Sequence, residues 1–307
     1  MIATNFDYDS CVRASEKVAW KLDEVFPPDL KLDYSRRFLP DSLTGVDSLP
    51  FLSPGERLKL NQINGNAYLY LFYFVEEYII ASVIQHANAE MFGDPAALRA
   101  LFRFADEEVK HQQLFMRFRE VFERSFGHSC DVIDNPQAVA EIILSKAPMA
   151  VALTTLHLEL VTQQHFTEGF RDGDSAGLDP AFASLLKNHW LEESQHAKID
   201  ALELQKLAAG ASADQISAAI EDYLGILGAF AGLLTAQGAL DVTSLERATG
   251  RVFTGDERSA IAAAQGAGYQ RALIALGVEN PSFQKYLLQY SEPGLARVNA
   301  AHRGAPS

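Results

Sequence analysis

The sequence is poor in residues that mark several common classes of protein. Its 307 residues include only 2 cysteines, Cys11 and Cys130. Two cysteines do not make a disulfide framework, so we expect a reducing, cytoplasmic setting. Lys and Arg number 26 against 40 Asp and Glu, which gives a net charge of -14. Because nucleic-acid binding depends largely on basic side chains, this balance argues against a nucleic-acid partner.

Leader-like segments and long apolar runs are also missing. The first twenty residues carry acidic side chains where a signal peptide would have a basic end followed by an apolar block. The longest apolar stretches, such as Tyr223–Leu234, are too short and too rich in Gly and Ala to span a bilayer. We therefore expect a soluble protein that has no membrane partner.

Helix start signals recur along the chain, whereas the alternating pattern of strands is nearly absent. Before each of four long helical patterns a capping residue precedes a proline, which is favoured in the first helical turn: Ser53-Pro54, Asp94-Pro95, Asn135-Pro136 and Asp179-Pro180. These signals predict four long helices at 53–91, 94–126, 135–170 and 179–208, the third interrupted at Pro148. Long helices joined by short connections predict an all-α four-helix bundle.

Shorter elements flank this bundle, and no linker is long or polar enough to divide the chain. Residues 1–52 combine a short helix near 11–26 with a Pro-rich coil. Residues 209–293 hold appended helices, one near 214–237 and others after 257 and 281, and residues 294–307 resemble a loose tail. We expect a single helical domain over 1–307, with the bundle at 53–208.

Two Glu-x-x-His pairs carry the clearest chemical signal. Glu108 and His111 lie on the second predicted helix, and Glu193 and His196 lie on the fourth. A spacing of three residues places both side chains of a pair on one helix face, close enough to bind one ion. One such pair is usually an ordinary solvated face. Its repetition on a second helix favours a metal site.

The other two helices each offer a buried carboxylate, as a ferritin-like di-iron bundle requires. Glu159 on the third helix lies between leucines, where an unpaired charge would be costly. The first helix offers Glu76 and Glu77. Helical phase groups Glu76 with apolar residues such as Phe72, so we prefer Glu76 as a ligand and keep Glu77 as the alternative.

Carboxylates and imidazoles in this proportion suit two iron ions, with manganese able to replace iron. His189 lies one turn before Glu193 and two turns before His196, so we interpret it as a third imidazole ligand, with a packed core histidine as the alternative. Glu107 and Glu192 each precede a motif glutamate. We expect them to accept the outer N–H of a ligand histidine from the opposite pair, or to be ordinary surface carboxylates.

The order of these residues resembles the p-aminobenzoate (arylamine) N-oxygenase family of ferritin-like di-iron oxygenases. That family repeats a Glu…(Asp/Glu)-Glu-x-x-His pattern and adds a third histidine one turn before the second Glu-x-x-His. The resemblance covers about residues 53–205, and this chain has Glu-Glu where the family has Asp-Glu. It implies seven metal ligands, namely Glu76, Glu108, His111, Glu159, His189, Glu193 and His196.

The resemblance further implies a di-iron, O2-activating oxygenase that N-oxygenates an aromatic amine or a similar small molecule. O2 would be the co-substrate, and an unidentified donor would supply electrons. Phe72 and Tyr73 are candidate pocket residues beside Glu76. Outer aromatic side chains of the first helix could support a homodimer.

Three other functions stay open. A di-iron monooxygenase or desaturase acting on a lipid or another small molecule would use the same ligands. A ferroxidase or iron-handling protein would share them too, although such proteins are usually shorter, single bundles. A metal-free helical bundle used for interaction would have to produce both Glu-x-x-His pairs by chance. Phe115 and Asp200 stand one turn after His111 and His196, where no tyrosine occurs, which disfavours a ribonucleotide-reductase-like radical store.

Overall fold

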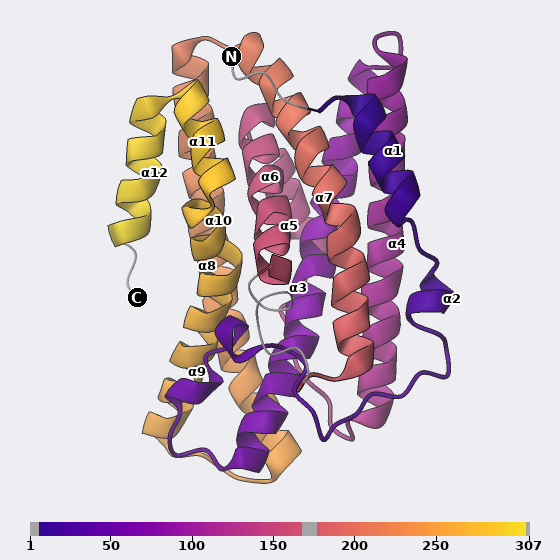
Figure 1. Cartoon of the computed structure of the whole chain (residues 1–307). Coiled ribbons are helices and arrows are strands. Elements are labelled where there is room, and N and C mark those ends of the chain that lie inside the picture. The colour runs from indigo at the N-terminus through magenta and orange to yellow at the C-terminus, as the bar shows by residue number, and fades with distance from the viewer. Residues whose placement is uncertain (1–5, 168–176, 305–307) are drawn as a thin grey trace.

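The computed structural model describes residues 6–167 and 177–304. Four long helices run side by side through the middle of the molecule (Figure 1): α3 (Pro54–Ala89), α4 (Pro95–Ser125), α6 (Pro148–His165) and α7 (Pro180–Ala209). Helix α3 packs along α4 and α6 along α7, while further contacts join α4 to α7 and α3 to α6. Within the described ranges the only strand-like feature is an isolated bridge between Arg37 and Leu178. The predicted all-α four-helix bundle is confirmed.

The helix starts follow from local capping. The Ser53 side chain accepts a hydrogen bond from the Glu56 N–H, and the Glu56 carboxylate accepts one from the Ser53 N–H. Asp94 and Asp179 cap α4 and α7 through the N–H groups of Ala96 and Phe182. Each cap satisfies backbone donors that the first helical turn leaves unpaired, and the proline after it has no such donor. Local sequence is therefore sufficient to place these starts.

The predicted third helix is two separate helices, α5 (Pro136–Leu144) and α6. Ala147 adopts an extended conformation, with φ -54° and ψ 136°, immediately before Pro148. A proline disfavours helical geometry in the residue before it, so the chain breaks here and resumes in a new direction. Helix α6 is regular to His165, and the predicted end near residue 170 lies outside the described residues.

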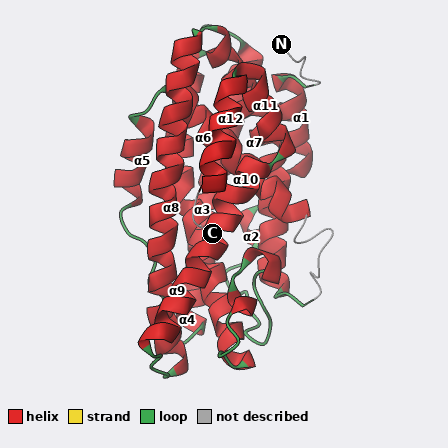
Figure 2. Cartoon of the chain, turned by 90° about the vertical axis from the view of Figure 1, so that its left-hand side faces the viewer, coloured by secondary structure: helices red, strands yellow, loops and turns green. Residues whose placement is uncertain are grey.

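Additional helices cover two opposite sides of the bundle. Helix α1 (Tyr8–Val18) packs across α4 and α7, and the one-turn α2 (Leu22–Val25) follows it. The predicted single helix at 11–26 is therefore wrong in its bounds. Two 3₁₀ turns, η1 (Asp41–Leu43) and η2 (Val46–Ser48), lie in the connection to α3. On the other side α8 (Ala213–Thr249) packs against α3 and α6, and α9 (Gly255–Gln270) packs along α8 (Figure 2).

Helix α8 continues well past the end predicted near Gln237, because Gln237 and Asp241 are buried and hydrogen-bonded to each other at 2.8 Å. Helix α9 runs directly into a π-helical turn, η4 (Arg271–Ala275), and then into α10 (Leu276–Glu279).

The chain ends in two further helices, α11 (Pro281–Tyr290) and α12 (Glu292–Gly304). The predicted loose tail from residue 294 is therefore wrong. The Ser291 side chain accepts a hydrogen bond from the Gly294 N–H, Val298 is buried, and Arg297 pairs with Glu221 of α8. These contacts hold α12 against α8.

Among the described residues two helices, α3 and α8, are long and apolar enough to cross a membrane by length and composition, contrary to the expectation from the sequence. In α3 the most apolar window is 67% buried inside the protein, as befits a core helix of the bundle. In α8, which lies on the outside of the bundle, the corresponding window is 39% buried.

Candidate metal centre

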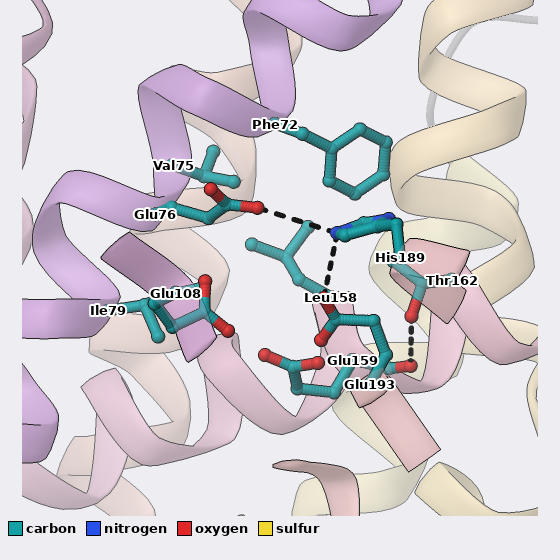
Figure 3. A pocket seen from close by; sticks show the side chains of 10 residues that line it. All are labelled: Phe72, Val75, Glu76, Ile79, Glu108, Leu158, Glu159, Thr162, His189 and Glu193. Atoms are coloured by element: carbon teal, nitrogen blue, oxygen red, sulfur yellow. Dashed lines mark hydrogen bonds and ion pairs between the residues drawn. The ribbon is translucent and has the colours of Figure 1, made fainter. Parts of the chain in front are cut away.

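The seven predicted ligands come from all four bundle helices and converge on one buried position. Figure 3 shows Glu76, Glu108, Glu159, His189 and Glu193 around a small cavity of about 10 Å³, which the aromatic ring of Phe72 also lines. None of the seven side chains is more than 3% exposed. The four-helix arrangement therefore gathers side chains that are spread over more than a hundred residues of sequence.

The candidate ligands form two overlapping groups whose ligand atoms lie within 4.8 Å of one another. The groups are Glu76, His111, His189, Glu193 and Glu108, His111, Glu193, His196. They share His111 and Glu193, so they describe two adjacent positions rather than two separate sites. Glu159 belongs to neither group, but it lines the same cavity, and its Oε2 lies 4.0 Å from Nδ1 of His196.

Glu193 occupies the middle of the cluster. Its Oε1 lies 2.7 Å from Nε2 of His189 and 3.0 Å from Nδ1 of His111. Its Oε2 lies 2.9 Å from Nδ1 of His196, and that nitrogen is also 2.8 Å from Oε1 of Glu108. Glu76 approaches from α3, with its Oε1 3.5 Å from Nε2 of His189. Glu193 is therefore within reach of both groups of candidate ligands.

Two further glutamates contact the ligand histidines at the ring nitrogen that faces away from the cluster. Each of them lies on the opposite helix, next to the other Glu-x-x-His pair. Oε2 of Glu192 lies 2.9 Å from Nε2 of His111, and Oε2 of Glu107 lies 3.0 Å from Nε2 of His196. An ionised carboxylate only accepts, so each Nε2 carries the proton. This leaves each Nδ1 directed toward the centre, the arrangement by which outer carboxylates orient metal-binding histidines.

The outer glutamates are themselves supported by residues that the sequence analysis missed. Lys110 Nζ donates to Oε1 of Glu192 at 2.5 Å and lies 4.1 Å above the ring of Trp20. The Ser15 hydroxyl of α1 donates to Oε1 of Glu107. Lys110 stands inside a Glu-x-x-His pair and could have been noticed. Ser15 and Trp20 lie far away in sequence, and no motif marks them.

Burial and neighbouring charges shift the pKa values of the carboxyl groups in the cluster. Burial, reinforced by the charge of Glu108, raises the pKa of Glu76 to about 8. Burial and then the charge of Glu193 raise the pKa of Glu159 well above its usual range. Burial alone would raise the pKa of Glu193, but the imidazoles of His189 and His196 lower it well below that range. Without a metal, protons therefore balance part of the carboxylate charge.

Several buried atoms of the cluster make no hydrogen bond of suitable geometry among the described residues, although some of them lie within 3 Å of another ligand atom. They are Glu76 Oε2, both carboxylate oxygens of Glu108, Glu159 Oε2, Glu193 Oε1, His111 Nδ1 and both ring nitrogens of His189. Buried polar atoms are normally paired, so their concentration around one point indicates a binding partner that accepts lone pairs. Two divalent cations would neutralise the four carboxylates and replace the bound protons. The residues present fit two metal ions.

The remaining candidates fall outside the cluster. Glu77 is half-buried and belongs to neither ligand group, in keeping with the preference for Glu76. Phe72 lines the cavity as expected. Tyr73 does not, because one residue turns a helix by 100° and directs its ring away, against Tyr70 at 5.7 Å between ring centres.

No family model and no curated protein matches the chain by sequence. Among solved structures it is similar to R2-like ligand-binding oxidases with an aerobically reconstituted Mn/Fe cofactor. One, a point mutant, is 14% identical over 88% of this chain and 94% of that chain, with a TM-score of 0.49. Another is 14% identical over 89% and 94%, with a TM-score of 0.48. At these values the likeness concerns the helical architecture alone.

Proposed function

We propose that this protein is an O2-activating oxidoreductase whose centre holds two metal ions, either two irons or one manganese and one iron. The observation that carries the proposal is the convergence of four buried carboxylates and three buried imidazoles, several of whose atoms make no hydrogen bond. Hard oxygen ligands together with imidazole nitrogen suit these metals. A zinc site would more often bind a single ion through four ligands.

The residues of this chain have separate tasks in such a centre. Glu76, Glu108, His111, Glu159, His189, Glu193 and His196 would hold the ions. Bound in this way, the metal pair would supply the redox chemistry that amino-acid side chains lack, the reduction of O2. Glu107 and Glu192 fix the orientation of the two histidines, and Lys110 holds Glu192. Phe72, Val75, Ile79 and Leu158 keep bulk water from the cavity.

Metal content of the purified chain, with and without anaerobic ferrous reconstitution, tests the proposal. The wild-type chain should bind about two irons, because two ligand groups are present. Glu108→Ala and Glu193→Ala should each lose bound iron, whereas Glu77→Ala, a matched change one position from Glu76, should keep it. Bound iron that is unaffected by the first two substitutions would refute the metal centre.

We further propose that the substrate is a small molecule and that an aromatic amine is the first class to assay, on the strength of the resemblance stated above. A cavity of about 10 Å³ holds no aromatic ring, so binding requires side chains such as Phe72 and Leu158 to move. O2 uptake that rises when an aromatic amine is added, with hydroxylamine or nitro product, would support N-oxygenation. O2 uptake stimulated only by other small molecules would exclude it.

The small size of the cavity also favours a second candidate, a ferroxidase, because oxidation of ferrous ions by O2 needs little space. The two candidates differ in stoichiometry and in size. A ferroxidase would oxidise many ferrous ions per chain without any organic substrate, and a storage protein would elute as a large multimer. Turnover that depends on an organic substrate would reject it.

A further inference from the structure

Two buried histidines of α6 each form a pair with a tyrosine of a neighbouring helix, His165 with Tyr68 of α3 and His157 with Tyr223 of α8. His165 Nδ1 lies 2.5 Å from the Tyr68 hydroxyl, and His165 Nε2 lies 2.9 Å from the carbonyl oxygen of Ala272. His157 repeats the pattern two turns earlier, with its Nδ1 2.8 Å from the Tyr223 hydroxyl and its Nε2 3.0 Å from a carbonyl of the same π turn. All four side chains are fully buried.

The hydrogen bonds fix where the protons of the Tyr68–His165 pair reside. A carbonyl oxygen only accepts, so Nε2 of His165 carries a proton and donates it to Ala272. Burial lowers the pKa of His165 to about 4, so the ring is neutral and Nδ1 has a free lone pair. Burial also raises the pKa of Tyr68 well above its usual range. The Tyr68 hydroxyl therefore donates to a ready proton acceptor.

Only the Tyr68 pair is linked to the candidate centre through ring contacts. The ring centre of Tyr68 lies 4.9 Å from that of Phe72, and Phe72 lies 5.5 Å from His189. Phe72 also lines the central cavity. In contrast, the ring contacts of Tyr223 are with His157 and Phe283, and neither is a candidate ligand.

We infer that Tyr68 is a one-electron donor to the proposed metal centre, with His165 as the acceptor of its proton. The inference rests on the proposed function, because the oxidant is the metal pair after its reaction with O2. The O–H bond of Tyr68 breaks, and its proton forms a new bond to Nδ1 of His165. One electron would pass by way of Phe72 to the oxidised metal pair that the proposed centre would hold, and the oxidation state of one metal would fall by one. A neutral phenoxyl radical and an imidazolium remain.

The surroundings of the pair favour this step over loss of an electron alone. A tyrosine that kept its proton would become a cation in an apolar site, which is costly. Transfer places the positive charge on an imidazole ring that still donates to Ala272. Tyr68 is 0% exposed, so the radical is shielded from solvent and from external reductants.

The test uses the full chain loaded anaerobically with ferrous iron, mixed with O2 and frozen for electron paramagnetic resonance. Ring-deuterated tyrosine identifies a tyrosyl signal by its narrowing. We expect the signal in the wild-type protein and its loss in Tyr68→Phe, which keeps the packing of the ring. Tyr223→Phe removes the same hydroxyl from the unlinked pair and should leave the signal unchanged. Iron content and O2 uptake are measured for each variant.

The outcomes separate this inference from the proposed function. Normal iron content and O2 uptake without a tyrosyl signal, or a signal that survives Tyr68→Phe, overturn the inference alone. Absence of iron or of O2 uptake in the wild type overturns the proposed function and the inference with it. Nitrogen NMR of the metal-free protein is a second measure, independent of metal. A proton found on Nδ1 of His165, rather than on Nε2, would also overturn the inference.

Discussion

Asp241 and Glu193 are both buried carboxyls, yet their neighbours give them opposite protonation. Asp241 accepts hydrogen bonds from Gln237 at 2.8 Å and from Tyr269 at 2.7 Å, and burial raises its pKa to about 7. Glu193 is equally buried, but imidazoles lower its pKa. Neutral donors leave a buried carboxyl prone to protonation, whereas adjacent cations keep it ionised. Asp241 therefore affects stability, and Glu193 is suited to hold a metal.

We predict that Asp241 lowers stability as the pH rises. Below about pH 4 the carboxyl is protonated in both the folded and unfolded states. Between about pH 4 and pH 7 the unfolded chain releases the proton while the folded chain keeps it, so the free energy of unfolding falls by about 4 kcal/mol. Asp241→Asn should remove this slope. Urea unfolding of both proteins between pH 5.5 and 8 checks it, and parallel curves would contradict it.

Outer carboxylates give a second prediction for single residues. Glu192→Gln and Glu107→Gln should each lower metal affinity about 10- to 100-fold, because the amide orients the ligand histidine less well and holds its N–H less strongly. Glu77→Gln should leave affinity unchanged. Competition titration against a metal-binding dye measures all three. Equal affinities for the wild type and the two outer variants would show that these glutamates only fill space.

At the scale of helices, α8 and α9 approach closely at a glycine pair. A Cβ atom on Gly238 would lie 2.5 Å from the carbonyl oxygen of Ala262 and 2.7 Å from the backbone nitrogen of Gly266. Backbone atoms of a packed helix cannot move aside as a flexible side chain can. The absence of a side chain at Gly238 thus permits this crossing, which joins the covering helices to each other.

Gly238→Ala should therefore lower the free energy of unfolding by about 2–3 kcal/mol, because it forces α8 and α9 apart. Gly232 lies in the same helix with open space around it, so Gly232→Ala should stabilise the protein by about 0.5–1 kcal/mol. Denaturant unfolding of the two variants measures the effect of the same Gly→Ala substitution at a close helix crossing and at an open position. A similar effect at both positions would refute the close crossing.

The difference between local signals and distant contacts explains how much of the fold and of the candidate site the sequence could predict. Helix starts depend on local caps such as Ser53 and Asp179, which can be identified in the sequence. The end of α8 and the existence of α12 depend on distant contacts of Asp241 and Val298, which local patterns do not reveal. In the same way helical spacing could group Glu193 with its neighbours on α7. The hydrogen bond from Ser15 of α1 to Glu107 could be found only in the tertiary structure.

At the scale of the whole molecule, metal binding and stability should be linked. Because an unfolded chain cannot assemble ligands from four helices, an ion that binds the folded form stabilises it by about 2.7 kcal/mol at a free concentration of 100 times its dissociation constant. Anaerobic ferrous iron or manganese should therefore raise the melting temperature, and a chelator should reverse the rise. Glu193→Ala should melt at the same temperature with and without metal.

The bundle consists of two helix pairs, α3 with α4 and α6 with α7, and a glutamate of each pair hydrogen-bonds a ligand histidine of the other. Glu192 on α7 orients His111 on α4, and Glu107 on α4 orients His196 on α7. Neither half therefore contains a complete ligand set with its supports, and a chain whose hairpins are wrongly paired offers no such set. Metal uptake thus distinguishes correctly assembled chains from misassembled ones. During biosynthesis, the ion should enter only after α7 has docked, so metal uptake marks the assembly of the four-helix bundle and does not require α8 to α12 to supply a ligand.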